Sequence, residues 1–511
     1  MKRSIWISII LITTLCLFAI TTVADAQEES AVEAQEYVPL TDASKKSKQV
    51  YTQLMHAVYS QAFNKDISNA KRIYDELVIQ AADSAFVWYK RGRLRYVMQD
   101  VRGAEKDTRQ ALKLNLLHVQ ATWQLAQILA DRATHAGQRP GEEVLETLKK
   151  VVELDSGHIM AHHMLANLAY QHGELDIAET SFKALTRVMP FEPTFHSRLG
   201  DLYQRLEKPQ EAIDAYKRVI KINPDDMRVL KSLGYLYLTN GVLEEAQQTY
   251  QQILSVEPQD VRSNLALGLV LQEMAQRAVV SENENSASEG IDKEKLIQDA
   301  EKYLGRAIFF SSEIINRTEN QRRRNVYNKI LVDAQFALAN VYFLFEDLEK
   351  AEELFLQVLE NDSTHVNATY LLGAVYQTMD EFEKAEKTFR KVLSFEPTHA
   401  DALNALGYLY AERGVNLDEA EALIKRALQK FPKNGAYLDS LGWVFFKQGR
   451  IAESITTLES ANQQMPNSVE VLMHLGDAYH KNGEPDKANR IWQQALTIEP
   501  DNSELQERLK Q

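Results

Sequence analysis

Three histidines stand close together in one stretch of the chain, His158, His162 and His163, with Asp155 just before them. Two imidazoles four residues apart on a helix can bind one metal ion, and zinc favours such ligands. No third ligand is evident nearby, and the chain lacks both a His-Glu-x-x-His motif and a cysteine pair. A solvated helix start explains these histidines better, so we predict no metal site.

Acidic pairs such as Glu352 and Glu353 are the other residues whose types suit acid–base chemistry. Within a helical pattern they fall on an outward face, where carboxylates commonly pair with Lys or Arg. The sequence contains no glycine-rich phosphate loop and no Gly-x-Ser-x-Gly motif. We therefore expect a chain that is not an enzyme and that uses no cofactor.

The elements that position these residues repeat along most of the chain. In a unit of about 34 residues, one position holds Gly or Ala in nearly every copy. These small residues are Gly92, Ala126, Ala166, Gly200, Gly234, Gly268, Ala339, Gly373, Gly407, Gly442 and Gly476. A second small residue, usually Ala, follows later in the unit, as Ser454 does after Gly442, and a Pro closes many units.

Helix packing explains this pattern. Two helices joined by a short turn approach closely only where their side chains are small, and larger apolar residues at spacings of three and four fill the flanking space. A Pro ends the second helix because it cannot continue one. One helical hairpin cannot bury its apolar face alone, so successive hairpins must stack. The sequence therefore predicts an all-α solenoid.

The pattern resembles the tetratricopeptide repeat family. The resemblance covers most of the chain, in about twelve units from Tyr51 to Asn502. It implies a right-handed superhelix of helix-turn-helix repeats, which we expect in two blocks. It also implies a protein whose role is to bind other proteins through peptide or helix segments.

In this family the first helix of each unit lines a concave groove, with its residues 2, 5, 9, 12 and 13 pointing inward. We expect exposed aromatic residues beside polar ones there, a combination that suits a protein ligand. The matching residues of the C-terminal block are Phe336, Asn340, Phe343, Tyr370, Gln377, Asn404, Tyr408, Asp439, Trp443, Phe446, Lys447, Met473, Asp477 and His480. The alternative is that neighbouring side chains cover these aromatic rings.

The middle of the predicted groove is more basic, with His163, Asn167, Arg198, Arg228 and Lys231. Some members of the family bind a peptide carboxylate with a clamp of Lys, Asn and Arg. Asn167 matches a clamp Asn, and Arg228 stands where a clamp Lys would, but His163 replaces the first Lys and Arg198 does not match. We expect a site for anionic peptides here rather than a true clamp.

Part of the C-terminal block has a narrower resemblance. The stretches 404–408, 438–444 and 474–477, with Trp492, are similar to a group of bacterial envelope tetratricopeptide proteins. That group includes an outer-membrane lipoprotein adaptor for a carboxy-terminal processing protease. Its members differ in function, so the protease is only one candidate partner.

The N-terminus resembles an export signal. Lys2 and Arg3 precede a largely apolar stretch, and Ala24-Asp25-Ala26 offers a cleavage site. Cleavage is favoured over an uncleaved membrane anchor, and both place the body outside the cytoplasm. The single cysteine, Cys16, follows Leu15 rather than the small residue that a lipidation signal requires. We expect a periplasmic or envelope location, with membrane association only through an uncleaved N-terminal segment or a partner.

The predicted organisation has six parts. They are a signal peptide (1–26), a flexible linker (27–50), an N-terminal repeat block (51–277), an interrupted seventh repeat with two insertions (278–331), a C-terminal repeat block (332–502) and a capping helix (503–511). The net charge of −14 makes nucleic acid an improbable partner, because phosphates repel an acidic surface. We expect a binding scaffold or adaptor of the cell envelope; the alternatives are a substrate receptor for a periplasmic protease or assembly machine, and an organiser of a polysaccharide-export complex.

Overall fold

The computed structural model describes residues 45–63, 65–283 and 292–510. The predicted signal peptide (1–26) and residues 284–291 of the predicted acidic interruption lie outside this described part.

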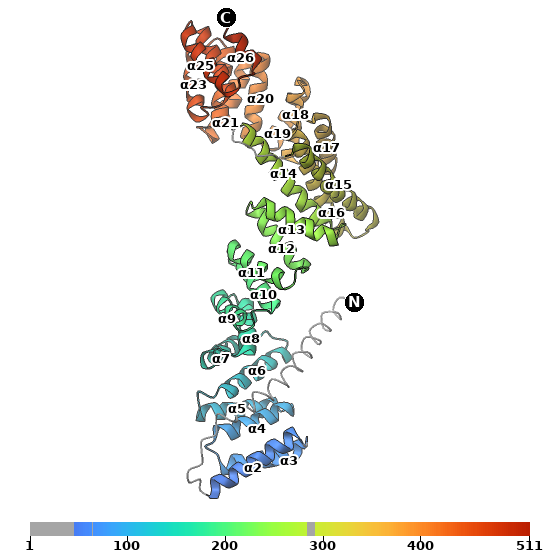
Figure 1. Ribbon diagram of the computed structural model, residues 1–511, viewed down its shortest axis with the longest axis vertical. Coiled ribbons are helices and arrows are strands. Elements are labelled where there is room, and N and C mark those ends of the chain that lie inside the picture. The colour runs from blue at the N-terminus through green and yellow to red at the C-terminus, as the bar shows by residue number, and fades with distance from the viewer. Residues whose placement is uncertain (1–44, 64, 284–291, 511) are drawn as a thin grey trace. The chain divides into compact units, whose positions relative to one another are not determined.

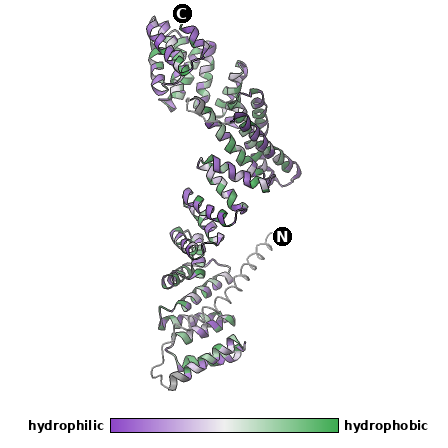
Figure 2. Cartoon of the chain, in the orientation of Figure 1, coloured by the Kyte–Doolittle hydropathy of each residue, from purple (hydrophilic) through white to green (hydrophobic). Residues whose placement is uncertain are grey.

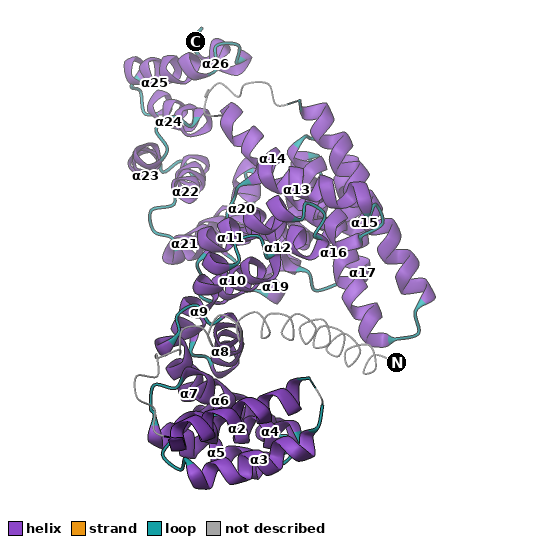
Figure 3. Cartoon of the chain, turned by 60° about the horizontal axis from the view of Figure 1, so that its bottom comes forward, coloured by secondary structure: helices purple, strands orange, loops and turns teal. Residues whose placement is uncertain are grey.

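All regular elements of the described residues are helices (Figure 3). Figure 1 labels many of these 25 helices along the chain. Their bounds are α2 (Lys45–Ala62), α3 (Ile67–Gln80), α4 (Ala85–Val97), α5 (Val101–Leu114), α6 (Val119–His135), α7 (Glu142–Leu154), α8 (Ile159–His172), α9 (Leu175–Val188), α10 (Pro193–Arg205), α11 (Pro209–Ile222), α12 (Met227–Thr239), α13 (Leu243–Val256), α14 (Val261–Asn283), α15 (Lys293–Arg317), α16 (Gln321–Leu344), α17 (Leu348–Asn361), α18 (Val366–Thr378), α19 (Phe382–Phe395), α20 (Ala400–Arg413), α21 (Leu417–Lys430), α22 (Gly435–Lys447), α23 (Ile451–Gln464), α24 (Val469–Lys481), α25 (Pro485–Ile498) and α26 (Ser503–Arg508).

The helices α2 to α25 form twelve successive pairs, so the predicted all-α repeat architecture is confirmed. Helices of one pair pack on each other, as α4 does on α5 and α22 on α23, and successive pairs within a compact region also contact each other, as α3 contacts α4 and α23 contacts α24. The short α26 packs on α25 and buries Leu505, which closes the C-terminal end of the array.

The predicted small residues mark the closest helix contacts. A Cβ added at Gly442 in α22 would lie 2.6 Å from Leu458 Cγ in α23. The Ser454 hydroxyl, fully buried in α23, donates to the Gly442 carbonyl oxygen at 2.8 Å. Similarly, a Cβ at Gly476 in α24 would lie 2.2 Å from Trp492 Nε1 in α25. Larger residues are excluded at these contacts because the facing side chains already fill the space.

Local signals at the helix ends agree with the sequence. Gly173 and Gly414 follow α8 and α20 in the left-handed conformation, with φ of 84° and 67°, which Gly adopts without strain. Several first helices begin with a histidine whose Nδ1 accepts a backbone N–H, as His365 does from Ala368 at 3.1 Å. Each helix mixes hydrophobic and hydrophilic residues along its length, as Figure 2 shows. The apolar residues pack between helices, and polar ones cover the outside.

Most of the described residues of the interrupted seventh repeat (278–331) lie in long helices. There α15 continues through Arg317 and α16 begins at Gln321. The helices α14, α15 and α16 pack on one another, and they also contact α13 and α17 on either side. The predicted linker (27–50) is likewise helical from Lys45, where α2 begins.

The described chain divides into two compact units, one ending at Leu202 and the other beginning at Tyr203. The division lies within α10 and not at 278–331, where a joint between two blocks was expected. The described residues of 278–331 lie mostly in α14 to α16, which pack on one another. The C-terminal unit carries the main candidate site.

Candidate functional site

The predicted groove residues of the C-terminal block all lie on first helices: α16, α18, α20, α22 and α24. We call this set the first-helix face. Asp439 and Trp443 are buried, at 4% and 8% exposure, while Lys447 and His480 are exposed. The other ten residues are half-buried. The expectation of exposed aromatic rings was therefore wrong for Trp443. The other aromatic residues of this face, Phe336, Phe343, Tyr370, Tyr408 and Phe446, are half-buried.

Stacking on histidines covers the aromatic rings of α16 and α18. The ring centroid of Phe336 lies 4.9 Å from that of His365, and Tyr370 lies 5.4 Å from His399. Both histidines cap the first helix of the following repeat. The aromatic position thus joins one repeat to the next, so part of its surface serves packing between repeats rather than ligand binding.

A denser cluster connects α22 with α24. His474 Nδ1 lies 3.0 and 3.1 Å from the two carboxylate oxygens of Asp439, and both side chains are buried. Trp443 stacks on His474 with ring centroids 4.1 Å apart and on Phe446 with centroids 4.7 Å apart. An imidazole, a carboxylate and two aromatic rings thus form one packed group from two consecutive repeats.

Hydrogen bonds to two acidic residues, Glu412 and Glu470, connect this cluster with α20. The Tyr408 hydroxyl donates to Glu470 Oε1 at 2.6 Å, which connects α20 with α24 across the intervening repeat. Trp443 Nε1 donates to Glu412 Oε1 at 2.6 Å. The Lys447 ammonium lies 4.8 Å from the centre of the Trp443 ring, a cation–π contact. First helices of three successive repeats are therefore joined through side chains.

The cluster has a negative electrostatic character. Burial lowers the pKa of His474, but the hydrogen bond and charge of Asp439, with the charges of Glu470 and Glu412, outweigh burial and raise that pKa above 6.5. Burial, together with the charge of Glu470, also raises the pKa of Tyr408. This part of the first-helix face therefore favours cations, whether a proton, a metal ion or a basic side chain.

Asp477, another predicted groove residue, forms an ion pair within the fold. Arg508 of α26 holds its carboxylate with two hydrogen bonds, of 2.8 and 3.1 Å. The hydrogen bond that Arg508 donates to Asp477 is the main cause that raises the pKa of Arg508. The pair attaches the terminal helix to α24 and leaves Asp477 less available to a ligand.

Sequence reasoning missed Glu412, Glu470 and His474. Glu412 and Glu470 occupy inward positions 13 and 2 of their units, so the family pattern already pointed to them. His474 is residue 6 of its unit, a position normally turned toward the neighbouring helix. Its role depends on Asp439 in the preceding repeat, a pairing that spacing within one helix does not show.

Family comparisons match four parts of the chain. Tetratricopeptide-repeat family models match residues 89–158, 193–226 and 230–260. A model of the middle TPR-like domain of cilia and flagella-associated protein 70 matches residues 335–489, which include the whole of the first-helix face from Phe336 to His480. Each of these matches spans less than half of the chain, and their repeat character agrees with the successive helix pairs of the described residues.

Individual proteins resemble the chain over shorter or more divergent stretches. A curated TPR repeat-containing protein of Pseudomonas aeruginosa is 39% identical over 67 residues, which are 13% of this chain and 11% of that relative. A tetratricopeptide repeat protein from Parabacteroides merdae has 17% identity and a TM-score of 0.40, covering 56% of this chain and 97% of that one. Yeast Tom70 has 13% identity and a TM-score of 0.36, covering 91% and 94%.

The predicted anionic-peptide site of the middle repeats divides between the two compact units. In the N-terminal unit, Asn167 Nδ2 donates to the His163 carbonyl oxygen at 2.8 Å, and Arg198 is exposed. In the C-terminal unit, Arg228 is exposed, while Lys231 pairs with Glu257 at 2.7 Å and Asp260 at 2.6 Å. Two acidic partners already neutralise Lys231, which weakens its attraction for an anion.

The histidines at the start of α8 have structural roles in these repeats. His158 Nδ1 accepts the Ala161 N–H at 3.1 Å, and its ring lies 4.9 Å from Trp123. His162 Nε2 lies 3.1 Å from the Ser156 carbonyl oxygen. Their nitrogens serve the helix start, in line with the structural role that the sequence favoured.

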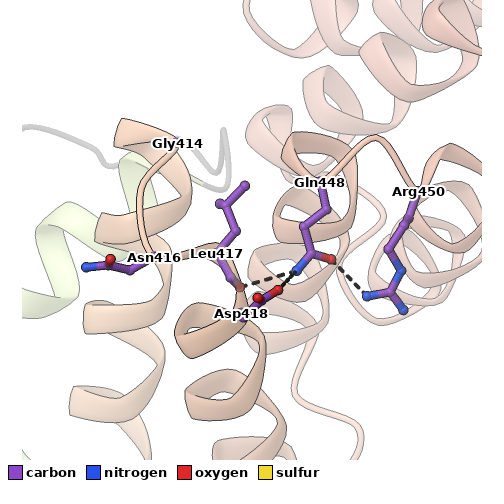
Figure 4. Close-up of a pocket in the computed structure, with 6 residues that line it drawn as sticks. All are labelled: Gly414, Asn416, Leu417, Asp418, Gln448 and Arg450. Carbon is purple, nitrogen blue, oxygen red and sulfur yellow. Dashed lines mark hydrogen bonds between the residues drawn. The ribbon is translucent and has the colours of Figure 1, made fainter.

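An open depression lies at the turns of two adjacent repeats (Figure 4). It is lined by Gly414, Asn416, Leu417, Asp418, Gln448 and Arg450. The Gln448 side-chain amide donates to the Leu417 carbonyl oxygen at 3.3 Å and accepts from Arg450 at 2.8 Å. These polar groups satisfy one another, so the depression is a connection between turns rather than a ligand site.

Within 45–63, 65–283 and 292–510, no helix combines the length and the apolar character needed to cross a bilayer.

Proposed function

We propose that this chain is a non-catalytic scaffold that binds segments of partner proteins on its first-helix face. Tetratricopeptide repeats generally bind peptides or proteins, and they generally act without catalysis. The observation that supports the site is the cluster that connects α20, α22 and α24 through side chains, because a preorganised surface loses little entropy on binding. Around it lie exposed charges, Glu412, Lys447 and Glu470, beside half-buried Phe446 and Met473.

The same proposal includes an envelope location. It is supported by the basic start, apolar stretch and Ala-x-Ala site of residues 1–26. The location is tested by fractionating cells that produce the full chain and by sequencing the N-terminus of the mature protein. A mature N-terminus at Gln27 in the exported fraction is expected; the full chain found only in the cytoplasmic fraction contradicts the location.

The binding surface is tested by crosslinking in intact cells, followed by identification of the crosslinked proteins. The test variant is Phe446→Ala with Lys447→Ala, because Phe446 is half-buried and Lys447 is exposed. The variant keeps the buried Trp443 itself, although it removes two side chains that contact its ring. The matched control is Phe431→Ala with Lys433→Ala, an aromatic and a lysine in the loop between α21 and α22. Circular dichroism checks that both variants remain folded.

We expect the first variant to lose at least one defined partner that wild type and control retain. The identity of that partner then distinguishes two possible roles of the chain: a substrate receptor for a protease or assembly machine, and an organiser of a polysaccharide-export complex. Equal crosslinking by wild type and both variants would show that partners bind elsewhere on the chain.

A further inference from the structure

Three side chains with metal-binding atoms converge on the first-helix face: Asp439 of α22 and Glu470 and His474 of α24. One carboxylate oxygen of each acid and one imidazole nitrogen all lie within 4.8 Å of one another. They are the one such group that the described residues contain. The sequence did not predict it, because Asp439 belongs to the repeat before the other two.

The geometry of the cluster already resembles that of a ligand shell. The distances of 3.0 and 3.1 Å between His474 Nδ1 and the Asp439 oxygens are close to the separation of neighbouring ligands that each lie about 2.0–2.2 Å from a zinc ion. Glu470 precedes His474 by four residues, so the two side chains lie on the same face of α24. Glu470 is exposed, so its carboxylate is accessible to an ion from solvent.

Groups around these three residues provide the support that metal sites commonly have. The Tyr408 hydroxyl donates to Glu470 and orients its carboxylate. Trp443 stacks on His474 and fixes the plane of the imidazole. The partners therefore hold two of the three side chains in place before any ion binds, which lowers the entropic cost of binding.

We propose that Asp439, Glu470 and His474 form a binding site for a divalent transition-metal ion, with Zn²⁺ as the ion that fits best. An imidazole with two carboxylates suits Zn²⁺, whereas Ca²⁺ and Mg²⁺ favour oxygen ligands alone. Three protein ligands leave a fourth position for water or for a group of a bound protein. The site therefore goes beyond the proposed scaffold function and does not depend on it.

The surrounding charges favour a cation at this point. The acidic side chains come from three helices: Asp439 from α22, Glu470 from α24 and Glu412 from α20. The Tyr408 hydroxyl of α20 also faces the group. The positive charge of Lys447, on α22, lies beside Trp443. A metal ion that binds His474 Nδ1 replaces the proton shared with Asp439. Zinc binding should therefore release a proton and weaken in acid.

The test uses the purified full chain, stripped of metal with a chelator, and isothermal titration with Zn²⁺. Absorption spectroscopy with Co²⁺ then reports whether nitrogen and oxygen ligands surround the ion. We expect saturable binding of one ion per chain and a Co²⁺ spectrum typical of four-coordinate geometry. Emission of Trp443, stacked on His474, should also change when Co²⁺ binds.

Variants connect the signal to these residues. Glu470→Gln and His474→Gln should each weaken Zn²⁺ binding by about 100-fold, and Tyr408→Phe by about tenfold. The control Glu504→Gln removes an exposed carboxylate that pairs with Arg508, and it should bind Zn²⁺ as wild type does. Thermal unfolding without metal checks that each variant is folded. Absence of saturable binding by wild type, or unchanged affinity in both ligand variants, would overturn the proposal.

Discussion

His474 and Asp439 show how single residues acquire a role from the repeat next to them. Both side chains are almost fully buried, and a buried polar group without a partner costs about 1–3 kcal/mol. Their mutual hydrogen bond removes that cost, and Trp443 covers the pair. The negative charge of Asp439, with that of Glu470 and Glu412, also makes this face attractive to cations.

His163 gives a prediction about acid stability at the residue scale. Burial, with a smaller effect of the Arg198 charge, lowers its pKa below 6.5 in the folded chain. Folding therefore favours the neutral imidazole, so its contribution is present above pH 6.5 and is lost as the pH falls through the folded pKa. Hydrogen exchange of α8 should accelerate more in wild type than in His163→Gln as the pH falls below 6.5, after correction for intrinsic exchange. Parallel pH dependence in both proteins would contradict this assignment.

At the scale of elements, the array depends on helix pairs that touch at small residues. Gly476 of α24 faces the buried ring of Trp492, and Gly442 of α22 faces Leu458. Gly305 of α15 differs, because a Cβ there would meet no atom within 4 Å. Adding a side chain to a helical glycine should therefore destabilise the fold at Gly476 and be tolerated at Gly305, although the sequence does not distinguish the two positions.

Substitution of these glycines by alanine should have effects of opposite sign. Gly476→Ala should destabilise its repeat by about 1–3 kcal/mol, because the new methyl group overlaps with Trp492. Gly305→Ala should stabilise by about 0.5–1 kcal/mol, because alanine favours the helix and space is open. Urea unfolding followed by circular dichroism measures both. A stabilised Gly476→Ala protein would show that α24 and α25 can separate without loss.

At the scale of the whole molecule, stability is distributed along the array. Within each compact unit, successive helix pairs contact each other, as α23 contacts α24, so the effect of a local change should fall off along the chain. The chain also divides into two compact units at Leu202 and Tyr203. A single unfolding free energy is therefore a poor description of a chain of this kind.

This locality is testable with the Gly476→Ala variant. Hydrogen exchange followed by mass spectrometry should show faster exchange in α22 to α26, because these helices contact the altered repeat directly or through one neighbour. Exchange in α4 to α8, in the N-terminal unit, should match wild type. Uniformly faster exchange along the chain would instead indicate one cooperative structure.

The sequence by itself determined the all-α repeat architecture and the tight contacts at residues such as Gly442 and Ser454. It could do so because these features depend on residues within one unit, where spacing along a helix translates directly into contact. The sequence also placed the residues of the first-helix face on first helices, because they recur at constant positions of the repeat.

Only the tertiary structure decided which side chains meet between repeats. Trp443 was expected to be exposed and is covered by His474 and Phe446, and Asp439 pairs with a histidine 35 positions away. Most described residues of the interrupted seventh repeat likewise lie in the long helices α14 to α16, because packing against neighbouring helices supplies most of a helix's stability in a folded protein. Contacts between repeats depend on how the units stack, and no spacing within a single unit encodes that arrangement.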